Sequence, residues 1–171
     1  MLFTIHSMNT TKLYLASLVC RILPETRCFE LKRKLYRWCG AQIGKNTKIT
    51  SSVVIIGSGK LSVGENVWIG HNSTIVCSNE VRIGNNVDIA PRVYIGDGTH
   101  EIDRNGAHVA GKGISGPVII NDGCWICINT TILPFTTIGE KTILAASSTA
   151  KGNVPAHEIW GGCLAHKIRS I

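Results

Sequence analysis

The residue best suited to acid–base chemistry in this chain is His100, which ends the segment Gly98-Thr99-His100. A histidine changes its protonation state near neutral pH, so it can remove a proton from a hydroxyl group, and such assistance contributes roughly 10²–10⁴-fold in rate. Glu80 stands twenty residues before His100, which is the length of one structural repeat in this part of the chain. We therefore take His100 as the candidate general base and Glu80 as the carboxylate that orients its imidazole.

Aliphatic residues at six-residue intervals predict the elements that must position His100 and Glu80. Self-similarity at a fixed short period is typical of a solenoid, and a period of six fits neither an amphipathic helix nor an alternating strand. A short strand and a corner every six residues give three faces and about eighteen residues per coil. The sequence therefore predicts an all-β solenoid, a three-sided parallel β-helix. Its inward positions are Ile43, Ile49, Ile55, Val63, Ile69, Ile75, Ile83, Ile89, Ile95, Ile120, Ile126, Ile132, Ile138, Leu144 and Ala150.

The corners between these strands support the same fold. Ile43-Gly44-Lys45-Asn46, Val63-Gly64-Glu65-Asn66 and Ile83-Gly84-Asn85-Asn86 open three series at twenty-residue intervals. Glycine and asparagine tolerate the positive φ that tight corners require. The alternative fold, an antiparallel sandwich of short strands, predicts variable spacings. The twenty-residue period also predicts that Lys60, Glu80 and His100 stack in one column, with neighbours about 4.8 Å apart.

The rhythm stops after His100. Residues 101–117 follow no six-residue register and include four glycines, and regular stacking resumes at Val118. We expect an excursion loop over 101–117, because long loops that leave a rigid scaffold often carry binding sites. The alternative is a solvated surface histidine without a function.

The 171 residues divide into an N-terminal helical cap (1–40), a β-helix (41–160) and a C-terminal tail (161–171). The net charge is +7, and residues 1–40 contribute seven Lys or Arg against two Glu, or +5. We expect helices near 10–22 and 25–38, with Pro24 at the start of the second. These helices cap the solenoid, and their basic surface also suits peripheral membrane contact by residues 1–40.

Other classes of protein are disfavoured by the sequence. The apolar stretch 13–20 is too short to span a bilayer, and no signal-peptide pattern precedes it. No aromatic-interleaved basic patch indicates nucleic-acid binding. Seven scattered cysteines do not suit a disulfide framework, so we expect a cytoplasmic protein. Cys124-Trp125-Ile126-Cys127 is a lone C-x-x-C pair with an inward Ile126 between the thiols, so we expect no metal there.

Several motifs resemble those of the hexapeptide-repeat acyltransferases, in the branch of maltose, galactoside and colanic-acid O-acetyltransferases. The likeness covers about residues 24–171 and depends on Val87-Asp88-Ile89-Ala90-Pro91, Gly98-Thr99-His100, Ala110-Gly111-Lys112-Gly113, Gly123-Cys124-Trp125-Ile126 and Ile132-Leu133-Pro134. It implies a left-handed coil, a homotrimer with active sites between subunits, and acetyl-CoA as donor. His100 falls on the family's catalytic histidine.

The resemblance also implies a donor site. Its positions are Trp125 near the reacting centre, Ile128, Ala146, Lys151 and Gly152 along the pantetheine channel, and His166 and Arg169 near the CoA phosphates. The acceptor-binding asparagine of the sugar enzymes falls near Gly70, so His71 and Asn72 are the candidate acceptor-binding residues. The predicted activity is acetyl transfer to a hydroxyl of a saccharide or related small acceptor.

The chain departs from the family at several positions. The family usually has glycine where Cys127, Phe135 and Ser147 stand, and its Gly-Asn-Pro-Ala appears as Gly162-Cys163-Leu164-Ala165. A non-catalytic β-helix scaffold is therefore one alternative. A zinc-dependent lyase like the β-helical carbonic anhydrases is another; it would need His100, His108 and His71 to converge on one metal ion.

Overall fold

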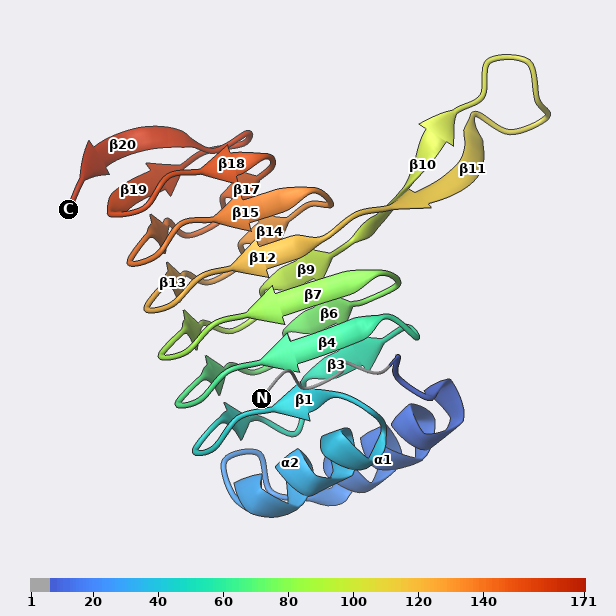
Figure 1. Cartoon of the computed structure of the whole chain (residues 1–171), viewed down its shortest axis with the longest axis vertical. Coiled ribbons are helices and arrows are strands. Elements are labelled where there is room, and N and C mark those ends of the chain that lie inside the picture. Colours follow the sequence, from blue (N-terminus) through green and yellow to red (C-terminus); the bar gives the residue numbers. More distant parts are fainter. Residues whose placement is uncertain (1–6) are drawn as a thin grey trace, which may run out of the picture.

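A computed structural model describes residues 7–171, in which two helices close one end of a column of stacked coils (Figure 1). A two-stranded arm leaves the column after the third coil. The strands form three parallel sheets, so each coil contributes one short strand to each side of a triangular prism. The predicted three-sided parallel β-helix is confirmed.

Each sheet contains strands from successive coils. Sheet A contains β1 (Gln42–Ile43), β4 (Lys60–Val63), β7 (Glu80–Ile83), β12 (Val118–Ile120), β15 (Thr136–Ile138) and β18 (Asn153–Val154). Sheet B contains β2 (Lys48–Ile49), β5 (Trp68–Ile69), β8 (Asp88–Ile89), β13 (Trp125–Ile126), β16 (Ile143–Leu144), β19 (Glu158–Gly161) and the antiparallel β20 (His166–Ser170). Sheet C contains β3 (Val54–Ile56), β6 (Thr74–Val76), β9 (Tyr94–Gly96), β14 (Thr131–Ile132) and β17 (Thr149–Ala150).

The column is stabilised by aliphatic side chains that stack directly over one another. In sheet B, Ile69 lies between Ile49 and Ile89, and the stack continues through Ile126 and Leu144. All five are fully buried. Burial of one such side chain contributes about 1.5–3 kcal/mol relative to exposure. The coils therefore depend on one another, since no single coil can bury its own rungs.

Asparagine ladders reinforce the corners between sheets A and B. Asn46, Asn66 and Asn86 all have the positive φ that the sequence predicted, between 55° and 57°. The Asn46 side-chain amide donates to Asn66 Oδ1, and the Asn66 amide donates to Asn86 Oδ1, both at 3.2 Å. The corners thus repeat both their backbone conformation and their side-chain bonds along the column.

The predicted excursion is not an irregular loop over 101–117. It is an antiparallel hairpin of β10 (Gly98–Ile102) and β11 (Ala110–Ser115), which we call the arm. The chain leaves the column at Gly98, before the histidine. Outside the column, the backbone N–H and C=O groups have no neighbouring coil, so the two strands pair with each other. His100 therefore belongs to the arm and pairs with Gly113.

The cap consists of α1 (Thr10–Ile22) and α2 (Phe29–Trp38). The Asn9 side chain caps α1 by accepting from the Lys12 N–H at 3.0 Å. The second helix begins four residues later than expected, and Pro24 lies in the preceding turn rather than in the helix. The reason is Lys32, whose buried ammonium group donates to the Pro24 and Glu25 carbonyls at 3.0 and 2.8 Å. Within residues 7–171, no helix is long and apolar enough to cross a membrane.

The C-terminal segment also has regular structure. Residues 161–171 were expected to be a tail, but β20 folds back and pairs antiparallel with β19 at the edge of sheet B. This pairing covers the last parallel edge of that sheet, because an open edge leaves N–H and C=O groups without partners.

We predict that Asn66→Ala lowers the free energy of unfolding by about 1–2 kcal/mol, because alanine loses the ladder bonds and is strained at positive φ. Asn66→Gly is the matched control. It loses the same bonds without the strain, so its loss should be smaller. Urea unfolding monitored by circular dichroism measures both, and equal losses would contradict the strain contribution.

Candidate functional site

Asp97 fixes the point at which the arm leaves the column. Its buried carboxylate accepts from the Ser78 and Asn79 N–H groups, both at 2.7 Å. Its carbonyl accepts from the Gly116 N–H at 2.8 Å, which closes the base of the arm. Burial and then the negative charge of Asp97 raise the pKa of Cys77 to about 12. Asp97 thus ties both strands of the arm to the previous coil.

Phe135 packs against the other side of this base. It lies at the corner of the next coil with φ of 61°, and its ring covers Gly116. A Cβ atom on Gly116 would lie 2.0 Å from the Phe135 ring, so only glycine is accommodated there. The arm is therefore held between the Asp97 corner below and the Phe135 ring above.

His100 is exposed on β10 and does not stack on Glu80. Lys60 and Glu80 are paired neighbours as predicted, but the strand beside β7 is β12, with Val118 opposite Val81. The expected column of three residues is therefore wrong at its third member. The physical reason is the early exit at Gly98, which removes His100 from the coil register.

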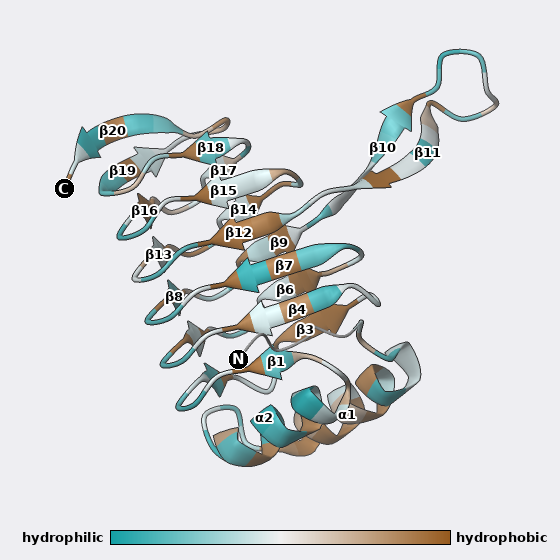
Figure 2. Ribbon diagram, in the orientation of Figure 1, coloured by the Kyte–Doolittle hydropathy of each residue, from teal (hydrophilic) through white to brown (hydrophobic). Residues whose placement is uncertain are grey.

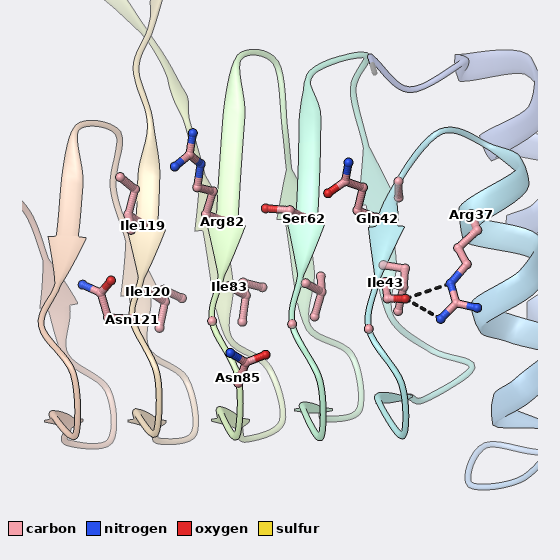
Figure 3. A pocket seen from close by; sticks show the side chains of 15 residues that line it. Arg37, Gln42, Ile43, Ser62, Arg82, Ile83, Asn85, Ile119, Ile120 and Asn121 are labelled. Carbon is pink, nitrogen blue, oxygen red and sulfur yellow. Dashed lines mark hydrogen bonds between the residues drawn. The ribbon is translucent and has the colours of Figure 1, made fainter. Parts of the chain in front are cut away.

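Glu80 has a different partner from the one expected. Its carboxylate accepts from Arg82 Nε at 2.8 Å, and both side chains lie on the outer side of sheet A. Figure 3 shows Arg82 in line with Gln42, Ser62 and Ile119 along a shallow groove of about 780 Å³. The orienting role of Glu80 toward His100 required the stacking, so it has no geometric basis within one chain.

The candidate acceptor residues lie at another corner of the column. His71 Nδ1 is 3.2 Å from Glu25 Oε2, and the Asn72 N–H donates to Ser52 Oγ at 3.1 Å. Glu25 also accepts from the Ser52 N–H and hydroxyl. These contacts fasten the cap to the first two coils. Within one chain, the structure does not bring His71 or Asn72 together with His100, which stands at the corner between sheets C and A.

The candidate donor residues occupy three places. Ile128 and Ala146 follow β13 and β16 at the corner between sheets B and C, where the Ser147 N–H donates to the Ile128 carbonyl at 2.9 Å. Lys151 and Gly152 lie at the corner between sheets C and A, the same corner as the arm. Trp125, His166 and Arg169 are exposed on sheet B, the last two on β20. The two corner groups therefore flank sheet C, one at the N-terminal ends of its strands and the other at the C-terminal ends.

The departures from glycine have distinct structural consequences. Phe135 and Ser147 both adopt positive φ, at 61° and 59°, which is the conformation that favours glycine. Ser147 is exposed, so its side chain points away from the core. Cys127 is half-buried, and burial raises the pKa of its thiol. Cys127 and Ser147 stand next to the candidate donor residues Ile128 and Ala146, whereas Phe135 stands at the base of the arm.

The histidines required for a zinc site do not converge within the chain. His100 and His108 are both exposed on the arm, whereas His71 contacts Glu25 at a different corner. Among residues 7–171, no three His, Cys, Asp or Glu side chains cluster as metal ligands do. In the C-x-x-C pair, the buried Cys124 thiol donates to the Gly139 carbonyl at 3.0 Å.

Asp97 and Phe135 are the positioning residues that the sequence did not assign to the site. A signal for Asp97 was present. It occupies the repeat position of Gly57 and Cys77, two residues after the inward aliphatic residue, where a lone charge needs hydrogen-bond partners. Phe135 gave no comparable signal, because its contact with Gly116 joins residues whose spacing does not follow the repeat.

Sequence comparison connects this geometry to known proteins. No family model matches the chain. The chain is 32% identical over 142 residues to a putative colanic acid biosynthesis acetyltransferase of Escherichia coli, across 79% of this chain and 76% of the relative. This chain belongs to the hexapeptide-repeat acetyltransferases. The galactoside O-acetyltransferase of Escherichia coli is 28% identical over 142 residues, across 83% of this chain and 70% of the relative.

Solved structures support the same fold. The hexapeptide-repeat acetyltransferase from Vibrio cholerae matches with a TM-score of 0.75 and 21% identity, across 94% of this chain and 89% of that protein. The expected left-handed β-helix of hexapeptide repeats is thereby confirmed, and the chain is an acyltransferase by family.

We predict that Asp97→Ala lowers acetyl transfer while the column stays folded, because the arm loses two hydrogen bonds at its base. Hydrogen exchange of residues 98–115 should become faster than in the wild type, whereas exchange in β13 to β16 should not change. Asp97→Asn, which keeps one amide oxygen acceptor, should fall between the two. Unchanged exchange in the arm would show that Asp97 does not hold it.

Proposed function

We propose that this protein transfers an acetyl group from acetyl-CoA to a hydroxyl group of a saccharide or related small acceptor. The proposal depends on one observation. In a chain of the acetyltransferase family, His100 lies on an arm whose base is fixed by Asp97 and Phe135 at a corner of the column. The names of the two Escherichia coli relatives point to saccharide acceptors. A structure of the Vibrio cholerae protein is a complex with acetyl-CoA.

In the proposed reaction, the neutral His100 imidazole removes the proton from the acceptor hydroxyl as that oxygen attacks the thioester carbonyl. The C–S bond then breaks, and the leaving CoA thiolate takes the proton from the imidazolium ion. Both substrates are present together, so no residue needs to be acylated. Holding the two reactants in one cleft supplies much of the rate. Glu80 holds Arg82 in this scheme and does not orient His100.

The proposed enzyme is a homotrimer with its sites between subunits. The strands of sheet C contain no charged residue, a composition that suits a buried protein contact. The arm stands at the C-terminal ends of the sheet C strands, and Ile102 and Val109 on the arm are 75% and 72% exposed. Ile128 and Ala146 lie at the N-terminal ends of the same strands. A neighbouring copy on sheet C would bring these two corners together, so His100 of one subunit faces the donor channel of the next.

Donor binding is assigned to residues at both corners that flank sheet C and to the C-terminal strand β20. Cationic side chains on β20, His166 when protonated and Arg169, suit the CoA phosphates. Exposed backbone near Ile128, Ala146, Lys151 and Gly152 suits the amides of pantetheine. We also propose a cytoplasmic location, because seven scattered cysteines do not suit a disulfide framework.

We predict that His100→Ala lowers acetyl transfer by at least about 10²-fold while leaving folding and CoA binding intact. His108→Ala is the matched control, since it removes an exposed imidazole from the same arm and should keep nearly full activity. Release of CoA thiol against a panel of sugars and nucleotide sugars measures both variants. Full activity of His100→Ala would contradict the general-base role, and no CoA binding by the wild type would favour the non-catalytic scaffold.

We also predict that CoA protects Cys127 against alkylation. Its raised pKa and partial burial should already make it slower to react than the exposed Cys28. Peptide mass spectrometry after maleimide treatment, with and without CoA, measures both thiols in the same sample. Cys28 lies in the cap, so its rate should not change. Equal labelling of Cys127 in the two conditions would place the donor away from Ile128.

A further inference from the structure

Helix α1 has an apolar face on each side. Leu13, Ala16 and Cys20 are buried against the column and α2. On the opposite side, Leu15, Leu18 and Ile22 follow each other at the spacing of one helix face and are 47%, 43% and 84% exposed. Tyr14 beside them is 63% exposed. A helix that only capped the solenoid would carry polar residues on its outer side.

Cations border this outer face. Helix α1 contains no acidic residue, and Arg21 lies exposed in its last turn. Lys12 lies at its first turn, with its ammonium 5.2 Å from the centre of the Trp38 ring, and Trp38 is itself 50% exposed on α2. Within the part of the chain that the structure describes, no carboxylate forms an ion pair with Lys12 or Arg21.

The charge decides which occupant suits this face. A second copy of the same face would bring its cations against like cations, which is unfavourable. An apolar protein surface would leave Lys12 and Arg21 unpaired at the border. An anionic lipid bilayer accepts the apolar side chains below its headgroups and offers phosphates to the cations. A helix of 13 residues is about 20 Å long, so it can lie in the plane of the bilayer.

We propose that the outer face of α1 docks on an anionic membrane surface, with Leu15, Leu18 and Ile22 among the lipid chains and Lys12, Arg21 and Trp38 at the headgroups. Figure 1 shows α1 lying across the end of the column, and Figure 2 shows apolar residues along it. The column then stands away from the bilayer.

The position of the arm relative to the cap suggests the acceptor class, an inference that rests on the proposed function. The arm leaves after the third coil, so its base lies about 15 Å from the cap along the column axis. From this base the arm runs away from the cap (Figure 1), so His100 lies farther from the bilayer than the base does. A saccharide of several units, attached to a membrane lipid by a phosphate, would span that distance. The acceptor class suggested by this geometry is therefore a lipid-linked saccharide.

The test is co-sedimentation of the full chain with vesicles. Vesicles of phosphatidylcholine containing one third phosphatidylglycerol should bind the protein in low salt, and high salt should weaken the binding. Vesicles of phosphatidylcholine alone should bind it much less. Equal binding to both kinds of vesicle, or no binding in low salt, would overturn the proposal.

Variants locate the binding on α1. The double variant Leu18→Glu/Ile22→Glu should lower the partition coefficient at least about tenfold, because it removes two inserted side chains and adds repulsion. Ile168→Glu/Ile171→Glu is the matched control, with the same charge change on exposed residues of the opposite end. Arg21→Gln should lower binding about fivefold and reduce its salt dependence. Thermal melting should show that all variants fold, since each substituted side chain is exposed.

Other occupants give different results. If the double variant reduces the mass seen by sedimentation velocity but binds vesicles as the wild type does, the face is a protein contact and the proposal is wrong. If deletion of residues 2–6, which include Leu2, Phe3 and Ile5, abolishes vesicle binding and the double variant does not, the binding belongs to that segment instead. Donor binding, measured by calorimetry with CoA, should be equal in the wild type and the double variant. Failure of docking and failure of the enzymatic proposal are therefore distinguishable.

Discussion

The structure depends on the stacking of inward aliphatic side chains from one coil to the next. Ile49, Ile69, Ile89, Ile126 and Leu144 stack in register in one sheet, and the other two sheets follow the same rule. The core is a narrow column in which each coil is stabilised only by its neighbours. The register of every strand is thereby fixed, and so is the place of every corner. Any functional group on this scaffold must stand on a corner, on an outer face, or on a segment that leaves the column.

The arm is the segment that leaves, and its geometry follows from that constraint. The hairpin interrupts the column without disturbing it, since Val118 resumes the register opposite Val81. Asp97 supplies hydrogen-bond partners for backbone N–H groups on both sides of the place where the arm leaves. Its carboxylate accepts from Ser78 and Asn79, and its carbonyl accepts from Gly116. A buried carboxylate is costly unless it is fully hydrogen-bonded, so Asp97 stabilises only this one arrangement. The base of the segment that carries His100 is in this way attached to the column.

The proposed function distributes its parts over two corners of the column, sheet B and the cap. One corner carries the arm with His100, together with Lys151 and Gly152, and the corner between sheets B and C carries Ile128 and Ala146. The other donor residues lie on sheet B, and the cap carries an exposed apolar face bordered by cations. Within one chain these parts are separate. Their separation is consistent with sites that form between copies and with a substrate that arrives at a surface, because both arrangements use elements that a single column leaves exposed.

The repeat spacing alone determined the solenoid, its inward residues and its positive-φ corners, because each of these depends on contacts between a residue and its equivalents one coil away. The same local logic predicted that Lys60 and Glu80 are neighbours. It failed for His100, for the start of α2 at Phe29, and for the strand formed by residues 166–170. In each of these places the backbone follows a partner outside the repeat: the opposite strand of the arm, the Lys32 ammonium group, or β19. Only the tertiary structure brings those partners together, so only it decided where the histidine stands and which face of α1 remains uncovered.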